Sequence, residues 1–211
     1  MDFLASIARF FHDGGLFMYP ILIIGVIGVA IIIERLIYVG TAWRENRTLW
    51  STLMPLVNKG DYAAAEQVAA DSRTAIGRVL GHGIASSRTA GSTREQVEMA
   101  MEESLMEVTP QLERRTHYLA VFSNVATLMG LLGTIVGLIH GFAAVSSIDA
   151  AQKASQLSES VSIALNCTAF GLIVAIPFLL VHSWLQSRTD QLVDSIEMAA
   201  VKFINSLGLE P

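Results

Sequence analysis

Three apolar stretches limit what this chain can fold into more than any other feature of its sequence. They cover residues 16–39, 118–145 and 159–186, and crossing the hydrocarbon core of a bilayer takes about 20 such residues. Within lipid the backbone must satisfy its own hydrogen bonds, so spanning segments of this kind form helices. Because 52% of the 211 residues are hydrophobic and only 16% are charged, the sequence predicts an all-α polytopic membrane protein with three transmembrane helices.

Basic residues are distributed unevenly around these spans, and that distribution predicts the topology. Most arginines and lysines fall in residues 40–117, whereas Arg9 alone precedes the first span and Lys153 alone lies in the loop 146–158. The positive-inside rule therefore places a helical domain, 40–117, and the C-terminal tail, 187–211, in the cytoplasm. The N-terminus and the loop 146–158 are expected on the opposite side.

The segment before the first span, residues 1–15, is predicted to be an amphipathic helix on the outer face of the membrane. Its apolar residues share one helical face: Phe3, Leu4, Ile7, Phe10 and Phe11. A disordered tail is the alternative. A cleaved signal peptide is disfavoured because Asp2 and Asp13 outweigh Arg9 and because the apolar run is too long.

The cytoplasmic segment 40–117 has a helical pattern throughout, interrupted at Gly60-Asp61. Ser92 followed by Glu95 fits a capping box, which marks a helix start. Since only Pro110 interrupts the pattern after that point, one long helix is predicted to run from here into the second span. Four carboxylates lie off its apolar stripe and are interpreted as a solvated face rather than a binding surface: Glu102, Glu103, Glu107 and Glu113.

Small residues mark one side of the second and third spans. In the second span Gly133, Gly137 and Gly141 recur every four residues, a pattern typical of close helix packing in membranes. In the third span a similar face carries Ala164, Thr168, Gly171 and Ala175. The two spans are therefore expected to pack tightly.

Thr134 and Thr168 lie within these small-residue helices and have two interpretations. Each hydroxyl could bond a carbonyl one turn back in its own helix, or the two could line a polar path. Their occurrence in two glycine-rich spans favours an ion pathway, for which the candidate residues are Thr134, Thr168, Gly133, Gly137, Ala164, Gly171, His140 and Asn166. His140 could also be a polar residue near the interface, and Asn166 could support a helix contact.

Neither span carries an Asp or Glu near its middle, although membrane carboxylates are the usual carriers of protons or sodium. If the chain conducts cations, another subunit must supply the titrating group. The single cysteine, Cys167, excludes a disulfide framework and a multi-cysteine metal site. We find no catalytic motif and expect neither an enzyme nor a cofactor. The net charge of −5 argues against nucleic-acid binding.

Two segments carry a resemblance to a known family. They are Gly130-Leu131-Leu132-Gly133-Thr134-Ile135-Val136-Gly137 and the run from Ala164-Leu165-Asn166-Cys167-Thr168-Ala169-Phe170-Gly171 to Pro177. With Glu34-Arg35 and Leu112-Glu113-Arg114, they resemble the MotA/TolQ/ExbB proton-channel family, and most closely its ExbB/TolQ branch.

The resemblance implies an inner-membrane homopentamer with a periplasmic N-terminus, in which the second and third helices line a pore. Inside would lie the transmembrane helix of an ExbD/TolR-like partner bearing one aspartate, near Thr134 and Thr168. Proton flow would drive movement that is passed on to the cell envelope, for example through a TonB-like protein to outer-membrane transport.

Other functions stay open at this point. A non-conducting membrane scaffold is the main alternative, and a Tol, gliding or flagellar-type stator of the same family is another. A small-solute carrier is disfavoured because three spans lack an inverted repeat. The choice between protons and sodium is open.

Overall fold

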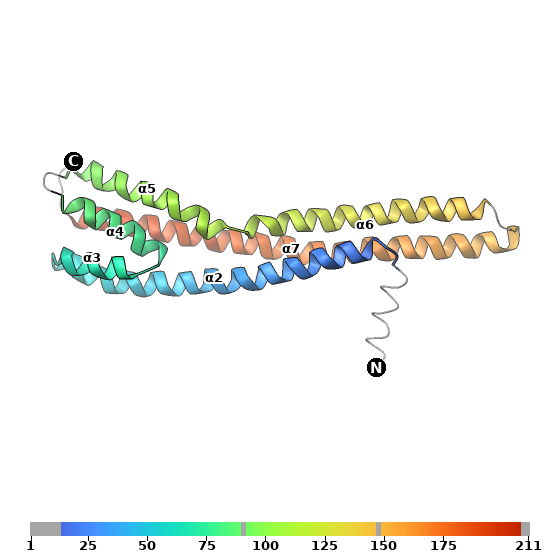
Figure 1. Cartoon of the computed structure of the whole chain (residues 1–211), viewed down its shortest axis with the longest axis horizontal. Helices are drawn as coiled ribbons and strands as arrows, with labels where there is room; N and C mark the ends of the chain where they lie inside the picture. The colour runs from blue at the N-terminus through green and yellow to red at the C-terminus, as the bar shows by residue number, and fades with distance from the viewer. Residues whose placement is uncertain (1–13, 90–91, 147–148, 208–211) are drawn as a thin grey trace, which may run out of the picture. The chain divides into compact units, whose positions relative to one another are not determined.

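Helices make up most of the described chain, with short turns between them. The computed structural model describes residues 14–89, 92–146 and 149–207, and no strand occurs among them. The helices are α2 (Met18–Asn58), α3 (Tyr62–Asp71), α4 (Ala75–Ser87), α5 (Arg94–Glu113), α6 (Thr116–Val145) and α7 (Ala150–Ser206) (Figure 1). The all-α prediction is confirmed. Most of the amphipathic helix predicted for residues 1–15 lies outside the described residues.

Two compact units make up the chain, and the long helices α2 and α7 each contribute to both. The first unit contains the residues up to 33 together with Arg115–Ser183. The second unit contains Glu34–Arg114 and the residues from Trp184 onward. The predicted boundaries near residues 40 and 187 thus fall inside continuous helices, because neither position carries a helix breaker strong enough to end them.

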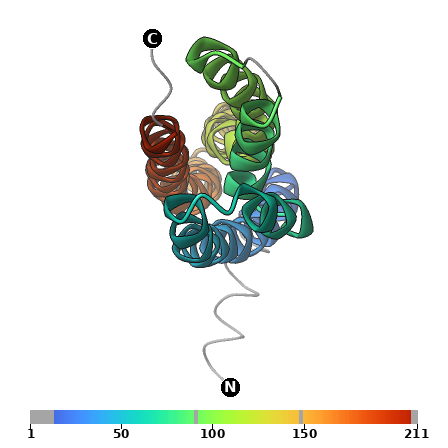
Figure 2. The same ribbon diagram turned by 90° about the vertical axis from the view of Figure 1, so that its left-hand side faces the viewer.

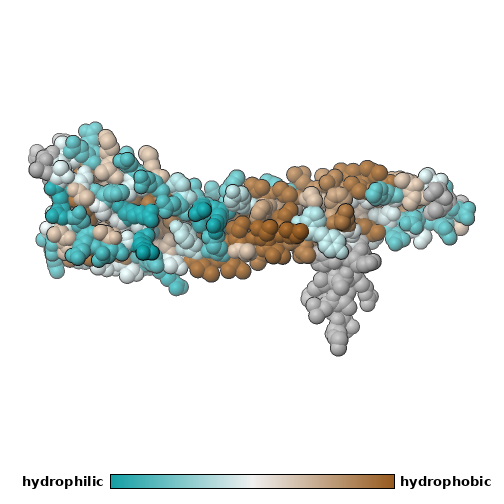
Figure 3. All heavy atoms as spheres, in the orientation of Figure 1, coloured by the Kyte–Doolittle hydropathy of each residue, from teal (hydrophilic) through white to brown (hydrophobic). Residues whose placement is uncertain are grey.

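The first unit presents apolar side chains on its surface. Three helices of the described chain are long and apolar enough to cross a membrane, with their apolar windows in α2, α6 and α7. Large apolar residues such as Ile23, Leu131 and Ile173 are exposed, and Figure 3 shows hydrophobic residues gathered over this unit. A surface of this size requires lipid or protein to cover it, in agreement with a membrane protein of three spans.

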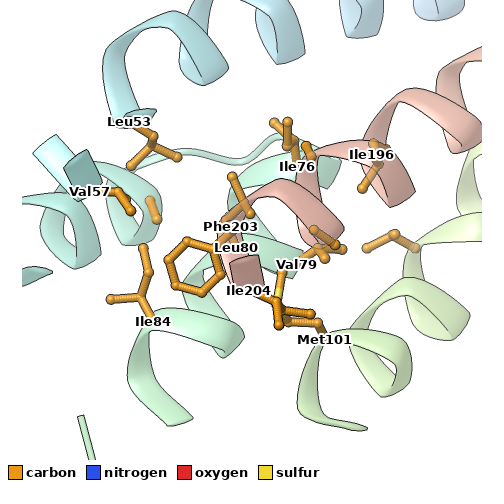
Figure 4. Close-up of a cluster of buried hydrophobic side chains, with 14 of the residues drawn as sticks. Leu53, Val57, Ile76, Val79, Leu80, Ile84, Met101, Ile196, Phe203 and Ile204 are labelled. Carbon is orange, nitrogen blue, oxygen red and sulfur yellow. The ribbon is translucent and has the colours of Figure 1, made fainter. Parts of the chain in front are cut away.

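The second unit has a conventional buried core. Leu53 of α2, Leu80 and Ile84 of α4, Met101 of α5 and Phe203 of α7 belong to one cluster (Figure 4). Figure 2 shows these helices end-on, from the left-hand side of Figure 1. The segment predicted as a tail therefore forms the last part of α7 and helps to stabilise this unit, since each buried side chain contributes about 1.5–3 kcal/mol.

Helix α5 begins one residue later than the sequence pattern predicted. Its N-cap is Thr93, whose side chain accepts a hydrogen bond from the Gln96 backbone N–H at 3.3 Å. The Gln96 side chain accepts in return from the Thr93 N–H at 3.2 Å. Ser92 instead donates its hydroxyl proton to the Ser86 carbonyl. The capping box predicted for Ser92 and Glu95 was therefore wrong. Two overlapping pairs, Ser92–Glu95 and Thr93–Gln96, fit the same motif.

Replacing Thr93 by alanine should loosen the first turn of α5. Losing one side of the capping box costs about 1 kcal/mol. Hydrogen exchange of the Gln96 and Val97 amides should accelerate roughly fivefold, the equivalent of that free energy. Thr93→Ser keeps the hydroxyl and should exchange like the native protein. Equal exchange in Thr93→Ala and the native protein would contradict the capping role.

The long helix predicted from residue 92 into the second span does not exist, because α5 and α6 are separate helices. Arg115 has a φ of 67°, in the left-handed region that ends a right-handed helix. Near this end of α5, the buried guanidinium of Arg35 donates to the Leu112 carbonyl and stacks 4.8 Å over the Tyr38 ring. A side chain from α2 thus satisfies a carbonyl in the last turn of α5.

The connection between α6 and α7 is shorter than the predicted loop 146–158. Helix α6 ends at Val145, and α7 already begins at Ala150. Residues 150–158 contain no glycine or proline and are rich in alanine and glutamine, so helix extension costs little. Pro177 lies within α7, which continues past it to Ser206.

Candidate functional site

Helices α6 and α7 contact each other through their backbones within the first unit. A Cβ atom added to Gly171 would lie 2.7 Å from the Ala126 carbonyl oxygen. One added to Gly130 would lie 3.2 Å from the Thr168 Cα. Only glycine permits such an approach, so the predicted close packing is confirmed, and the contact also includes Ala126 and Gly130, which the sequence analysis had left off the packing face.

The rest of the predicted small-residue stripe lies in the same contact. A Cβ on Gly137 would lie 3.0 Å from the Cβ of Ala164, and one on Gly141 would lie 2.6 Å from the Cβ of Ser160. Gly133 lies against the buried thiol of Cys167. Cys167 therefore acts as a small packing residue in this helix pair.

Thr134 and Thr168 meet at the centre of this contact. Their hydroxyl groups are hydrogen-bonded to each other. The Thr134 hydroxyl lies 3.1 Å from the Gly130 carbonyl oxygen, one turn back in its own helix. The Thr168 hydroxyl reaches the same oxygen at 2.9 Å, across the helix boundary. Thr134 thus bonds a carbonyl of its own helix, as the first interpretation expected. Thr168 instead bonds a carbonyl of α6, the neighbouring helix.

The two hydroxyl groups have more hydrogen-bond acceptors around them than protons to donate. Each hydroxyl donates one proton and has two lone pairs. Gly130 and Ala164 offer carbonyl oxygens, the latter 3.5 Å from the Thr134 hydroxyl, and each threonine can also accept from the other. Hydroxyl lone pairs consequently remain for a third group. Both side chains are half-buried, so such a group can approach them.

A third hydroxyl joins the same two helices and was not singled out by the sequence. The buried Ser123 donates to the Ala175 carbonyl of α7 at 2.7 Å. Ser123 precedes Thr134 by 11 residues, which is three helical turns. That spacing could have indicated a shared face, but serine alone is too common in helices to mark a contact.

The remaining candidate residues are not brought to the threonine pair by hydrogen bonds. His140 is exposed and Asn166 is half-buried, and neither bonds Thr134 or Thr168 in the part of the chain that the structure describes. Over those residues, no three His, Cys, Asp or Glu side chains could together hold a metal ion. The threonine pair therefore remains the candidate site within the apolar helices.

Comparison with known proteins points to one family. The model of the MotA/TolQ/ExbB proton channel family matches residues 71–198, which include α6 and most of α7. A putative biopolymer transport protein ExbB homolog of Methanothermobacter thermautotrophicus is 25% identical over 199 residues, covering 94% of this chain and 69% of that protein. The putative biopolymer transport protein ExbB-like 1 of Synechocystis sp. is 32% identical over 196 residues, covering 87% of this chain and 72% of that protein.

Another relative matches over a shorter segment. The Tol-Pal system protein TolQ of Haemophilus influenzae is 34% identical over 94 residues, covering 44% of this chain and 39% of that protein. The match to the family model contains both threonines and the glycines that bring their helices together.

Proposed function

The chain belongs to the MotA/TolQ/ExbB proton channel family, and we propose that it is the channel subunit of a proton-driven motor in the bacterial inner membrane. It assembles as a homopentamer around the transmembrane helix of an ExbD/TolR-like partner. Proton passage moves one component relative to the other. The movement is transmitted to the cell envelope, for example through a TonB-like protein that energises outer-membrane transport.

The observation that carries this proposal is the pair of threonine hydroxyls between α6 and α7. Together they leave lone pairs available at a half-buried position in otherwise apolar helices. The spans around them contain no central carboxylate, so an aspartate of the partner supplies the proton carrier. A protonated carboxyl donates to a threonine oxygen, and a carboxylate accepts from a threonine hydroxyl.

The other candidate residues have supporting roles in this proposal. Gly133, Gly137, Ala164 and Gly171 hold α6 and α7 at the separation that lets the hydroxyls meet. His140 and Asn166 lie along the pathway, both on the side of the pair nearer the connection between α6 and α7. The helical segment 40–117 and the end of α7 lie in the cytoplasm, as the distribution of basic residues indicates.

A non-conducting scaffold is the second candidate function. It is favoured by the finding that both hydroxyls already have acceptors within the chain, because such bonds would also serve helix packing alone.

The names of the relatives, which refer to biopolymer transport, favour import over flagellar-type rotation.

Proton flux in proteoliposomes separates these two functions. We expect the chain reconstituted with its ExbD/TolR-like partner to acidify or alkalinise vesicles under an imposed pH gradient, measured with an enclosed pH-sensitive dye. An aspartate-to-asparagine substitution in the partner is the matched control and should abolish the flux. A sodium gradient in place of the pH gradient tests the other ion. Absence of any flux with a correctly assembled complex would support the scaffold.

A further inference from the structure

The second unit has a basic, tryptophan-lined groove between α2 and α7. A cavity of about 250 Å³ is lined by Trp43, Trp50, Arg47 and Lys202 among other residues. A second cavity of about 260 Å³ shares Trp43 and adds Trp184 and two arginines. The groove thus contains all three tryptophans of the chain. No Asp or Glu lines either cavity, so the groove suits an acidic, partly apolar occupant.

The floor of this groove carries hydrogen-bond donors that lack acceptors. Asn46 is only 4% exposed and accepts from the Ile76 N–H at 3.3 Å through its Oδ1 atom. Its Nδ2 atom, like the buried Nε1 atom of Trp43, has no acceptor among the described residues. Buried donors of this kind are normally satisfied, and since both atoms are closed to solvent, an acceptor from outside reaches them only when neighbouring side chains move.

Helix α5 of the same unit has a face with the complementary chemistry. Met99 and Met106 are 62% and 73% exposed, and they are seven residues apart on one side of the helix. Glu102 and Glu103 lie between them and are exposed as well. We call these four residues the Met–Glu face. Val97, Met101 and Val108 direct the opposite side of α5 into the core, so the two methionines face outward, and Glu102 also borders a cavity beside α7.

We propose that the groove of one copy accepts the Met–Glu face of α5 from the next copy. The methionines pack on the tryptophans, and the carboxylates pair with Arg47 and Lys202. This inference rests on the proposed oligomer and deepens it by naming the surfaces that join its copies. It also replaces the interpretation of Glu102 and Glu103 as a merely solvated face.

The geometry of such a contact is head-to-tail. The groove and the Met–Glu face are different surfaces of one unit, so each copy uses one surface toward each neighbour. A contact of this kind is heterologous, and repetition about an axis closes a ring of copies. An isologous dimer would instead require the groove and the Met–Glu face to lie in one self-complementary patch, so that each meets the other across a two-fold axis.

Charge reversal tests the contact without knowledge of which carboxylate pairs with which basic residue. We expect the groove variant Arg47→Glu/Lys202→Glu and the face variant Glu102→Arg/Glu103→Arg each to lower the fraction of oligomer at least about tenfold, because like charges then oppose each other. The combined variant restores complementarity and should recover the native mass. The measurement is mass photometry of the full chain purified in detergent, without a partner. Lys59→Glu and Asp71→Arg, on exposed positions elsewhere in the unit, are the matched controls and should keep the native mass.

Other outcomes would overturn the inference. Native mass in both reversed variants would do so, as would failure of the combined variant to reassemble. If the groove variant stays oligomeric but loses bound anionic phospholipid, measured by lipid mass spectrometry, the groove is a lipid site instead. None of these measurements uses a proton gradient, so the contact and the proposed function can fail separately. A complex that still conducts protons with its groove charges reversed would refute the contact and leave the proposed function standing.

Discussion

Replacing Thr134 and Thr168 together by valine should abolish proton-driven activity while leaving the protein folded and membrane-inserted. Valine matches the shape of threonine but has no hydroxyl, so the partner's carboxyl loses both hydrogen-bond partners. A hydrogen bond to a charged group contributes about 1.5–3 kcal/mol, and losing two should slow proton transfer about a hundredfold or more. The readout is proton flux in vesicles, or partner-dependent uptake in cells, compared with cells treated with an uncoupler.

Two variants serve as controls for this result. Thr134→Ser/Thr168→Ser keeps both hydroxyls and should retain most of the activity. Ser123→Ala removes the other hydroxyl that joins α6 to α7, the one bonded to the Ala175 carbonyl, and should affect stability more than flux. Full activity of the double valine variant would refute the role of the pair in ion transfer. Equal losses in the Ser123 and threonine variants would point to packing instead.

The sequence singled out both threonines, although not their bond to each other, because the small residues around them are a local signal. Glycines spaced by four residues indicate close packing wherever they occur in an apolar helix, and Gly137 and Gly141 contact α7 as expected. The partner of the Thr168 hydroxyl was not predictable in the same way. It depends on how near α7 comes to the Gly130 carbonyl, and that approach is set by a three-dimensional contact rather than by either helix alone.

The errors in the fold prediction have a similar origin. The end of α5 depends on Arg35, which lies 77 residues earlier and donates to the Leu112 carbonyl. No pattern within residues 92–118 contains that information. The prediction of the start of α5 failed for the opposite reason, because the local pattern fits two places. Ser92–Glu95 and Thr93–Gln96 both satisfy the capping-box rule. Only the backbone geometry at Thr93 distinguishes the two.

Substituting alanine for Gly171 should destabilise the protein, although alanine is the better helix former. In an open helix the change would gain up to about 1 kcal/mol. At Gly171 the new methyl group would lie 2.7 Å from the Ala126 carbonyl oxygen and 3.2 Å from the Gly130 Cα. Both are backbone atoms, so the helices must separate. Overpacking of this kind costs about 1–3 kcal/mol.

Gly40→Ala provides the matched comparison. Gly40 also lies within a helix, but a Cβ atom there would meet nothing within 4 Å. Thermal unfolding of the purified protein should therefore shift in opposite directions, downward by roughly 5 °C for Gly171→Ala and slightly upward for Gly40→Ala. Separating α6 from α7 also draws Thr168 away from the Gly130 carbonyl, so Gly171→Ala should lose proton flux even below its unfolding temperature. A Gly171→Ala protein as stable and active as the native one would mean that the helices can move apart freely, and the close contact would then not be what positions the threonines.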